Sequence, residues 1–415
     1  MRIRKFTAIG FRGLERAELD LERGRTFAVV GVNGAGKTSI LDGIAMALSR
    51  LEARIRTSHG RGREVREEDI RLGSTRLELR VEVDWQGRSA SWHLEKVRWP
   101  QVGSNGSSYE SLGELADGIR ARIETNESSS VPLMVFYPVN RSVVDIPLRI
   151  RKPHTFDQRA AYEDALSGAS ADFRRFFEWF RDREDYERER RDDDLGFKDP
   201  QLEGVRRSIE ALVPGFKRLR VKRQPLRMLV DKDGKELAVN QLSDGEKCLL
   251  AMVGDLARRL ALANPGLDDP LQGDGVVLID EIELHLHPAW QRSVVGALEQ
   301  TFPNCQFILT THSPAVLGHL DRNCVFLLAP TAPEPVQVLT TLGQDANRLL
   351  EDVFGVPARP PEFEALLAQL FAAIENDRLE EARVKVAELR RVYEDREPEL
   401  VRAEAYIRRK EILGR

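Results

Sequence analysis

The hydrophobic residues of this chain fall into recurring patterns, and each pattern predicts one kind of element. Leu77, Leu79, Val81 and Val83 alternate with polar residues, and a second alternating run follows the turn at 86–88, which predicts a β-hairpin. Continuous apolar runs are typical of strands that are buried on both faces of a sheet. Such runs occur at four places and predict buried strands: 26–30, 131–137, 275–280 and 305–310.

Helical spacing appears between these strands. A helix is predicted over 38–50, directly after the first buried strand, and others are predicted over 245–263 and up to Phe302. The basic, glycine-containing stretch that begins at Arg54 has no periodicity, so we expect a surface loop there. The region from Arg149 to Pro225 is charged and helical in pattern.

An aromatic stripe marks one helix of that charged region. Phe173, Phe176, Phe177 and Phe180 stand at i, i+3, i+4 and i+7, which places them on one helix face. We expect this face to pack on the core, with docking of a partner as the alternative. The charged residues that follow are expected to form a solvated helix surface.

The end of the chain, 361–412, has the pattern of a small helical bundle. Its predicted helices are separated by short polar spacers, and each carries an apolar stripe. The stripe residues are Leu366, Leu370, Phe371, Ile374, Leu379, Ala382, Val386, Leu389, Leu400, Ala403 and Ile407.

The composition describes a globular protein without a general attraction to polyanions. The chain has 415 residues, 31% of them charged, and a formal net charge of −4, so contact with nucleic acid would have to be local. Its three cysteines form no Cys-x-x-Cys pair, and the apolar runs are too short for a membrane span. We therefore expect a cytoplasmic protein that makes no membrane contact.

The stretch "GVNGAGKT", Gly31–Thr38, matches the phosphate-binding pattern G-x-x-x-x-G-K-[ST] and lies between a predicted strand and a helix. Backbone N–H groups at the start of that helix can surround a phosphate, Lys37 adds a positive charge, and the Thr38 hydroxyl can hold Mg²⁺. The candidate ATP-binding residues are Asn33, Gly34, Ala35, Gly36, Lys37, Thr38 and Ser39.

Acidic residues follow the predicted strand at 275–280. Asp280 is placed to hold Mg²⁺, and Glu281 is placed to orient or deprotonate the attacking water. His312 follows the next strand, where it can hydrogen-bond the γ-phosphate. His285 and His287 are too few for a zinc site, and we expect a turn at a subunit interface there.

A second candidate anion site lies in "LSDGEK", 242–247. Ser243 and Gly245 begin a predicted helix, where a hydroxyl and free N–H groups can bind phosphate, and Glu246 follows within the first turn. One chain would need two anion sites if the second site binds the ATP that is held by another copy of the chain.

These motifs occur in the order seen in ABC-type ATPases, which the chain therefore resembles. "FRGL" before the phosphate loop, "LDGI" after it, and "HLHP" after the acidic pair resemble the SMC/RecF/OLD branch. The resemblance implies a P-loop NTPase of the α/β class, an ABC-ATPase head with a mixed sheet plus antiparallel β-hairpins. It also implies a head-to-tail dimer in which Lys37 and Thr38 meet Ser243 and Gly245 of the second copy.

The predicted division has four parts: an N-terminal ATPase lobe over 1–148, a charged helical insert over 149–225, a C-terminal ATPase lobe over 226–345 and a helical interaction region over 346–415. One departure from the family concerns a glutamine that usually senses Mg²⁺ occupancy and that this chain lacks. The chain has "VFYPVNRS" at that place, where Asn140 or Arg141 are the candidate replacements.

The insert and the C-terminal helices are similar to PtuA-like ATPases of Septu and retron-associated anti-phage systems. That similarity implies a separate HNH nuclease partner that the ATPase regulates. Two alternatives are kept: a RecF/SMC-like DNA-repair ATPase that contacts nucleic acid through Arg54, Arg56, Arg61 and Arg63, and the nucleotide-binding subunit of a transporter.

Overall fold

The computed structural model describes residues 1–98, 106–126, 128–139, 156–168, 173–329, 335–337, 341–357, 359–392 and 397–413. Contacts between residues divide the chain into two compact units, Met1–Leu349 and Leu350–Arg415. Among the described residues, no helix is both long and apolar enough to cross a membrane.

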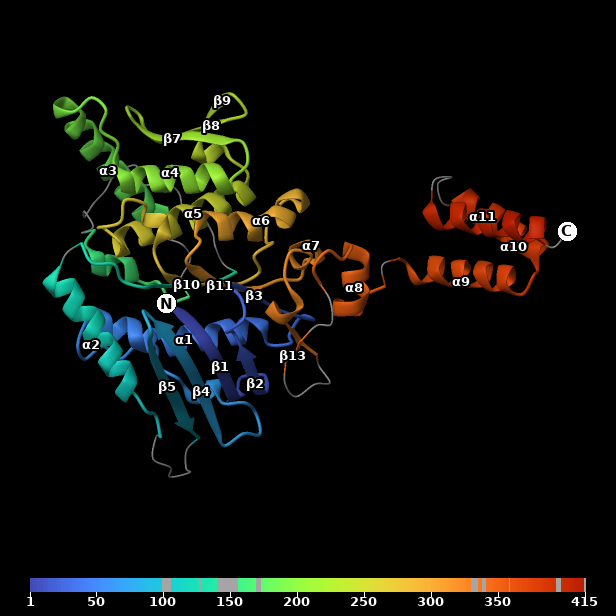
Figure 1. Cartoon of the computed structure of the whole chain (residues 1–415), viewed down its shortest axis with the longest axis horizontal. Helices are drawn as coiled ribbons and strands as arrows, with labels where there is room; N and C mark the ends of the chain where they lie inside the picture. Colours follow the sequence, from blue (N-terminus) through green and yellow to red (C-terminus); the bar gives the residue numbers. More distant parts are fainter. Residues whose placement is uncertain are drawn as a thin grey trace. The chain divides into compact units, whose positions relative to one another are not determined.

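The core of the first unit is a six-stranded sheet in the order β13-β12-β3-β11-β10-β6. Figure 1 labels β10, β11 and β3 at its centre. Every neighbouring pair is parallel except β12 with β13. Because parallel strands end at the same edge, the residues that follow β3, β6, β10 and β11 are brought together there. The strands are β3 (Thr26–Gly31), β6 (Leu133–Tyr137), β10 (Gly275–Ile279), β11 (Cys305–Thr310), β12 (Val325–Leu328) and β13 (Val336–Gln337).

A second, antiparallel sheet has the order β2-β1-β4-β5. The predicted hairpin is confirmed: Leu79 pairs with Leu94, Val81 pairs with Trp92, and the inward side chains of β4 are buried. Helix α1 (Lys37–Arg56) packs against strands of both sheets (Figure 1). The strands are β1 (Arg2–Phe11), β2 (Leu14–Asp20), β4 (Arg76–Trp85) and β5 (Arg88–Val97).

Helix α1 is longer than predicted, since the sequence pattern placed its end at Arg50. Leu51 and Ile55 continue its buried face, so the helix runs to Arg56 and includes Arg54, which was expected in a loop. The other helices that lie wholly in the first unit and outside the insert are α2 (Glu110–Thr125), α5 (Asp244–Ala263), α6 (Pro288–Thr301) and α7 (Pro314–Leu317). Short 3₁₀ turns lie at Glu67–Asp69, Val239–Gln241, Pro270–Gln272 and Arg322–Cys324, and one lies within the insert at Gln158–Tyr162.

The aromatic stripe of the insert packs on the core, as predicted. Phe173, Phe176, Phe177 and Phe180 are all buried, and a Cβ on Gly254 of α5 would lie 2.8 Å from two ring atoms of Phe176. The described part of the insert contains helices α3 (Phe173–Asp193) and α4 (Pro200–Leu212).

The prediction that the insert is helical as far as Pro225 is wrong. Residues Phe216–Arg223 form a strand, β7. Leu219 and Val221 are buried, and the residues beside them are exposed or half-buried, as in a strand with one face on the core. This strand pairs with β8 (Leu226–Lys232), which pairs with β9 (Lys235–Ala238).

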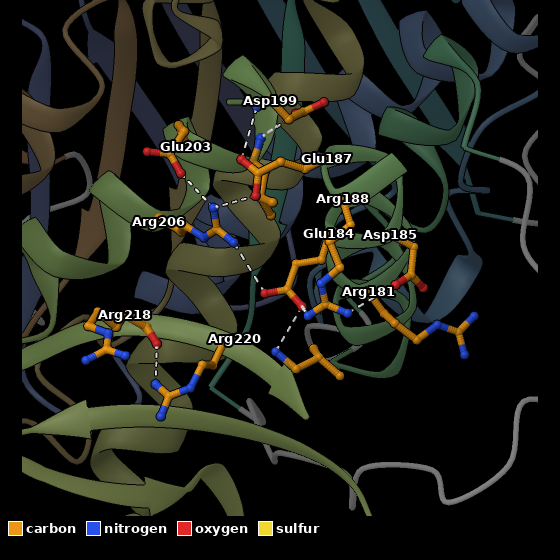
Figure 2. Close-up of polar contacts among 12 residues, drawn as sticks. Arg181, Glu184, Asp185, Glu187, Arg188, Asp199, Glu203, Arg206, Arg218 and Arg220 are labelled. Atoms are coloured by element: carbon orange, nitrogen blue, oxygen red, sulfur yellow. Dashed lines mark hydrogen bonds and ion pairs between the residues drawn. The ribbon is translucent and has the colours of Figure 1, made fainter. Parts of the chain in front are cut away.

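Most charged residues at the end of α3 form the solvated surface that was expected, but two glutamates depart from that expectation. Glu184 and Glu187 are buried, and Arg206 of α4 donates hydrogen bonds to both of them and to Glu203 (Figure 2). Glu184 further accepts from the N–H of Val221 in β7 at 3.1 Å. Buried carboxylates require such partners, so the acidic residues join α3 to α4 and to the small sheet.

The second unit is a helical region, as predicted. Helix α8 (Ala346–Phe354) spans the division between the units, and α9 (Pro361–Glu375), α10 (Leu379–Val392) and α11 (Pro398–Leu413) follow. Leu366, which was expected in the core, is exposed, and its neighbour Leu367 is buried instead. The buried cluster consists of Phe363, Leu367, Leu370, Ala373, Ile374, Ala382, Val386, Leu389, Leu400, Ala403 and Ile407. The α/β fold with a mixed sheet, antiparallel hairpins and a helical C-terminal region is thus confirmed.

Candidate functional site

The phosphate loop connects the end of β3 to the start of α1. Gly31, Gly34 and Gly36 all have positive φ angles, of 150°, 81° and 101°. A Cβ on Gly31 would lie 2.6 Å from the carbonyl oxygen of Leu328, and one on Gly36 would lie 2.7 Å from the Leu14 side chain. Backbone conformation therefore favours glycine at all three positions, and close packing also requires it at Gly31 and Gly36.

The side chain of Lys37 is folded back over the loop. Its Nζ donates to the carbonyl oxygens of Gly31 and Val32, at 3.1 Å each. Burial lowers the pKa of Lys37, and the nearby carboxylates of Glu281, Asp280 and Glu283 oppose that effect. The phosphate loop and the acidic turn after β10 therefore lie within electrostatic reach of each other, as the motif order predicted.

The remaining loop residues are open to a ligand. Asn33, Gly34 and Thr38 are exposed, and Ala35 and Ser39 are half-buried. The first N–H groups of α1 have no carbonyl partner inside the helix, so they can donate to an anion.

Thr310, at the end of β11, fixes the acidic pair. Its hydroxyl donates to Oδ1 of Asp280 at 2.5 Å and accepts from the N–H of Glu281 at 2.7 Å. Asp280 is buried, and Glu281 has a φ of +47°, a left-handed conformation that is rare for a side chain of its size. Backbone strain of this kind is common at functional sites, where the surrounding structure holds the residue in a strained conformation that orients its side chain.

Glu283 connects the acidic turn to the histidine after β11. Its Oε1 accepts from the N–H of His312 at 2.5 Å, and Ile282 N–H donates to the carbonyl oxygen of Thr310 at 3.1 Å. Neither Glu283 nor Thr310 was among the predicted site residues. Glu283 lies in the motif "ELHLHP" and Thr310 lies in "TTHSP". Their hydrogen bonds connect one motif to the other, so neither motif by itself indicates them.

The turn predicted at His285 and His287 is present, and the interface role remains a prediction. His285 has a φ of +64°, and Nδ1 of His287 accepts from the N–H of Ala289 at the start of α6. Among the described residues, no group of three or more His, Cys, Asp or Glu side chains is arranged to hold a metal ion.

The signature segment begins α5 with a reciprocal cap. Glu246 Oε2 accepts from the N–H of Ser243 at 3.0 Å and from its hydroxyl at 2.9 Å, and the hydroxyl accepts from the N–H of Glu246. Lys232 forms an ion pair with Glu246 at 2.5 Å. Burial disfavours the charged form of Glu246, and the hydrogen bonds from Lys232 and Ser243 still hold its pKa below the usual value.

Gly245 packs against the turn that follows the acidic pair. A Cβ at this position would lie 2.2 Å from the carbonyl oxygen of His285. Among the described residues, no hydrogen bond or ion pair joins Ser243, Gly245 or Glu246 to the phosphate loop of the same chain. The structure therefore brings Lys37 close to the acidic turn. The signature cap packs on the turn at His285 and is not bonded to the phosphate loop of its own chain.

Two further predictions concern the surroundings of the site. Asn140 and Arg141, the candidate replacements for the family glutamine, lie outside the described residues. Three of the four arginines proposed for DNA contact have a partner within the chain, whereas Arg56 and Arg61 are exposed. Arg63 pairs with Asp42 at 2.6 Å, Arg56 pairs with Glu52 at 3.8 Å, and Arg54 lies over the Tyr109 ring.

Comparison with known proteins gives a family match and several relatives. Residues 27–318 match AAA_21, described as "AAA domain, putative AbiEii toxin, Type IV TA system". The chain is 30% identical to the Retron Ec83 probable ATPase of Escherichia coli, over 85% of this chain and 76% of that one. It is 31% identical to the Retron Vc95 probable ATPase of Vibrio cholerae serotype O1 biovar El Tor, over 76% of this chain and 71% of the relative.

Two other similarities are more limited. The Septu protein PtuA of Bacillus mycoides (strain KBAB4) is 38% identical over 91 residues, which are 22% of this chain and 12% of the relative. Among solved structures, the SMC head bound to the C-terminal winged-helix domain of ScpA has a TM-score of 0.45 and 17% identity. That comparison covers 79% of this chain and 94% of the SMC head.

Proposed function

Because this chain belongs to the AAA_21 family of ABC-like ATPases and is related to the retron probable ATPases and to Septu PtuA, we propose that it binds ATP in the loop Gly31–Ser39 and hydrolyses it with Mg²⁺. The observation that carries this proposal is the position of Lys37. Its ammonium group lies on the phosphate loop and within electrostatic reach of the acidic turn at 280–283.

Each residue of the site then has a chemical role. The N–H groups of the loop and Lys37 hold the β- and γ-phosphates. Mg²⁺ would neutralise developing charge between these phosphates, with the Thr38 hydroxyl and the Asp280 carboxylate as oxygen ligands of the type it prefers. Glu281 accepts a proton from water while the water oxygen bonds to the γ-phosphorus and the bond to the β-phosphate oxygen breaks. His312 hydrogen-bonds the γ-phosphate.

The signature cap is proposed to act on the ATP of a second copy. Ser243 begins α5, so the following N–H groups, including that of Gly245, have no partner inside the helix. A phosphate placed there would meet those donors and the positive end of the helix dipole. The functional unit is then a head-to-tail dimer with two composite sites, each of which combines Lys37 of one copy with Ser243 of the other.

The partner proposal rests on the named relatives. Retron and Septu ATPases support a role in anti-phage defence, in which this chain regulates a separate nuclease of the HNH type. The proposal predicts that an HNH nuclease is encoded beside this chain, and that co-expression of the two yields one complex that survives size exclusion. The DNA-repair alternative depends on the basic stretch 54–63, in which Arg56 and Arg61 are exposed, and it stays a separate prediction.

Two variants test the proposed reaction. Lys37→Met should abolish ATP binding, whereas Glu281→Gln should bind ATP, hydrolyse it about 10²–10⁴-fold more slowly, and accumulate as a dimer in ATP. Glu15→Gln is the charge-matched control, because that side chain is 69% exposed and lies on the antiparallel sheet. Hydrolysis by Glu281→Gln at the wild-type rate would contradict its role as the base, and a wild-type chain that neither binds nor hydrolyses ATP would refute the function.

A further inference from the structure

A buried hydrogen-bonded path joins the acidic edge of the sheet to the signature helix. Tyr137 is the last residue of β6, and its carbonyl oxygen accepts from the N–H of Asp280 at 2.9 Å. Its hydroxyl donates to Oδ2 of Asp255 in α5 at 3.0 Å. Both side chains are only 1% exposed, so water does not compete for this bond. One residue therefore contacts both the proposed Mg²⁺ ligand and the helix that Ser243 begins.

The acceptor at the far end of this path is held ionised and in place. Oδ1 of Asp255 accepts from Arg258, and Oδ2 accepts from Nε of Arg259, both at 2.7 Å. Burial opposes the charge, but the two guanidinium groups outweigh it and lower the pKa of Asp255 to about 2. Burial and the Asp255 charge both raise the pKa of Tyr137, which therefore keeps its proton. The tyrosine is therefore the donor in this hydrogen bond.

The network also fixes the outer edge of β6. Nη1 of Arg259 donates to the carbonyl oxygens of Ala161 and Glu163, at 2.7 and 3.0 Å. The segment they belong to covers that edge, because the N–H of Phe136 donates to the carbonyl oxygen of Ala165 at 2.8 Å. A well-packed apolar cluster is often at least as stabilising as buried ions of this kind. A contribution to stability alone therefore does not explain why the buried charges of Asp255, Arg258 and Arg259 lie beside β6.

The geometry also connects the path to the signature cap. Asp255 lies about three turns along α5 from Ser243, and a helix of this length moves as a rigid element. A displacement of the cap would therefore reach Asp255 through the helix, and the end of β6 through the Tyr137 hydroxyl. The N–H of Asp280 would move with it, because it is bonded to the carbonyl oxygen of the same residue.

We propose that Tyr137 is a positioning residue for ATP hydrolysis, which makes the placement of Asp280 depend on the placement of the signature helix. Engagement of Ser243 by the nucleotide of a second copy then aligns the acidic edge of the first. This inference rests on the proposed function of the site. It assigns to a side-chain hydroxyl the coupling for which the sequence lacks the usual glutamine.

The test compares two buried tyrosines that each lose one hydroxyl. Tyr137→Phe breaks the bond to Asp255, and Tyr162→Phe breaks a bond to the carbonyl oxygen of Pro132 at 2.8 Å. Tyr162 is equally buried and lies in the segment beside the same strand, so both variants should lose similar stability. Only Tyr137→Phe is expected to lower kcat, by about tenfold, with the Kd for ATP unchanged.

Three measurements decide the outcome: the melting temperature, the Kd for ATP and kcat for the full-length chain. Equal kcat values in Tyr137→Phe and Tyr162→Phe, whether both are normal or both are reduced, would overturn the positioning role. A fall in ATP affinity that matches the fall in kcat would also overturn it, since it would indicate general damage to the fold. A wild-type chain without hydrolysis refutes the proposed function and this inference together, whereas an active wild type with two equal variants refutes this inference alone.

Discussion

Replacing Gly245 with alanine should destabilise the first unit, although the same change usually stabilises a helix. A Cβ at this position would lie 2.2 Å from the carbonyl oxygen of His285 and 3.2 Å from its carbonyl carbon. The Cβ is fixed to the helix backbone and the atoms that it meets belong to the backbone of His285, so no flexible side chain can move away. The start of α5 is fixed by the reciprocal bonds of Ser243 and Glu246, and the opposing turn is fixed in its left-handed conformation at His285.

The magnitude follows from the displacement that is required. Relieving the contact needs a shift of about 1 Å between α5 and the turn, and strain of this kind typically costs about 1–3 kcal/mol. Gly296 in α6 supplies the matched control, because a Cβ there would meet nothing within 4 Å. Gly296→Ala should therefore stabilise the protein by roughly 0.5–1 kcal/mol through helix propensity alone.

Urea unfolding followed by tryptophan fluorescence measures both effects. All five tryptophans lie within residues 1–349, so the signal reports the first unit and not the helices of the second. We expect opposite signs: a lower midpoint for Gly245→Ala and a higher one for Gly296→Ala. If Gly245→Ala is as stable as Gly296→Ala, the contact with His285 does not constrain this position, and the packing explanation of Gly245 is refuted.

Other changes test the buried charges. Burial raises the pKa of Glu52 from 4.5 to about 7. Between these two values the folded chain keeps a proton that the unfolded chain releases, so the free energy of unfolding falls as the pH rises from about 4.5 to about 7. Glu52→Gln should remove that dependence and stabilise the chain at pH 8 by up to about 3 kcal/mol; an unchanged pH profile of unfolding would contradict it. Arg206→Ala should cost about 3–5 kcal/mol because Glu184 and Glu187 lose a buried partner. Its neighbour Arg207, which is 57% exposed and paired with Asp269, should cost no more than about 1 kcal/mol when changed to alanine, and equal losses would argue against the buried network.

The elements that the sequence predicted well are those whose signal is local. The strand, glycine loop and helix at 26–56 and the hairpin at 76–97 are each specified by residues that are neighbours in the chain. The strand at 216–223 was missed because its alternation is short and lies within a charged, helical composition. The burial of Glu184 could not be predicted, because the partners that neutralise it belong to α4 and β7.

The same distinction applies to the candidate site. Lys37, Asp280, Glu281 and His312 were predicted as site residues because motif spacing places each of them at the end of a strand or the start of a helix. The bonds that orient them join residues far apart in sequence, by 30 positions for Thr310 with Asp280 and by 118 for Tyr137 with Asp255. No periodicity relates such pairs, so they emerge only from the strand order of the sheet and from the packing of α5 beside β6.

The composite site between two copies is tested most directly by mixing two inactive variants. Lys37→Met removes the phosphate-loop cation, and Ser243→Arg fills the signature anion site. An equimolar mixture should regain about a quarter of the wild-type ATP hydrolysis, because half of the dimers are mixed and each mixed dimer holds one intact site. Recovery of that fraction supports the head-to-tail dimer. No recovery, together with a wild-type rate per chain that does not depend on protein concentration, would contradict it.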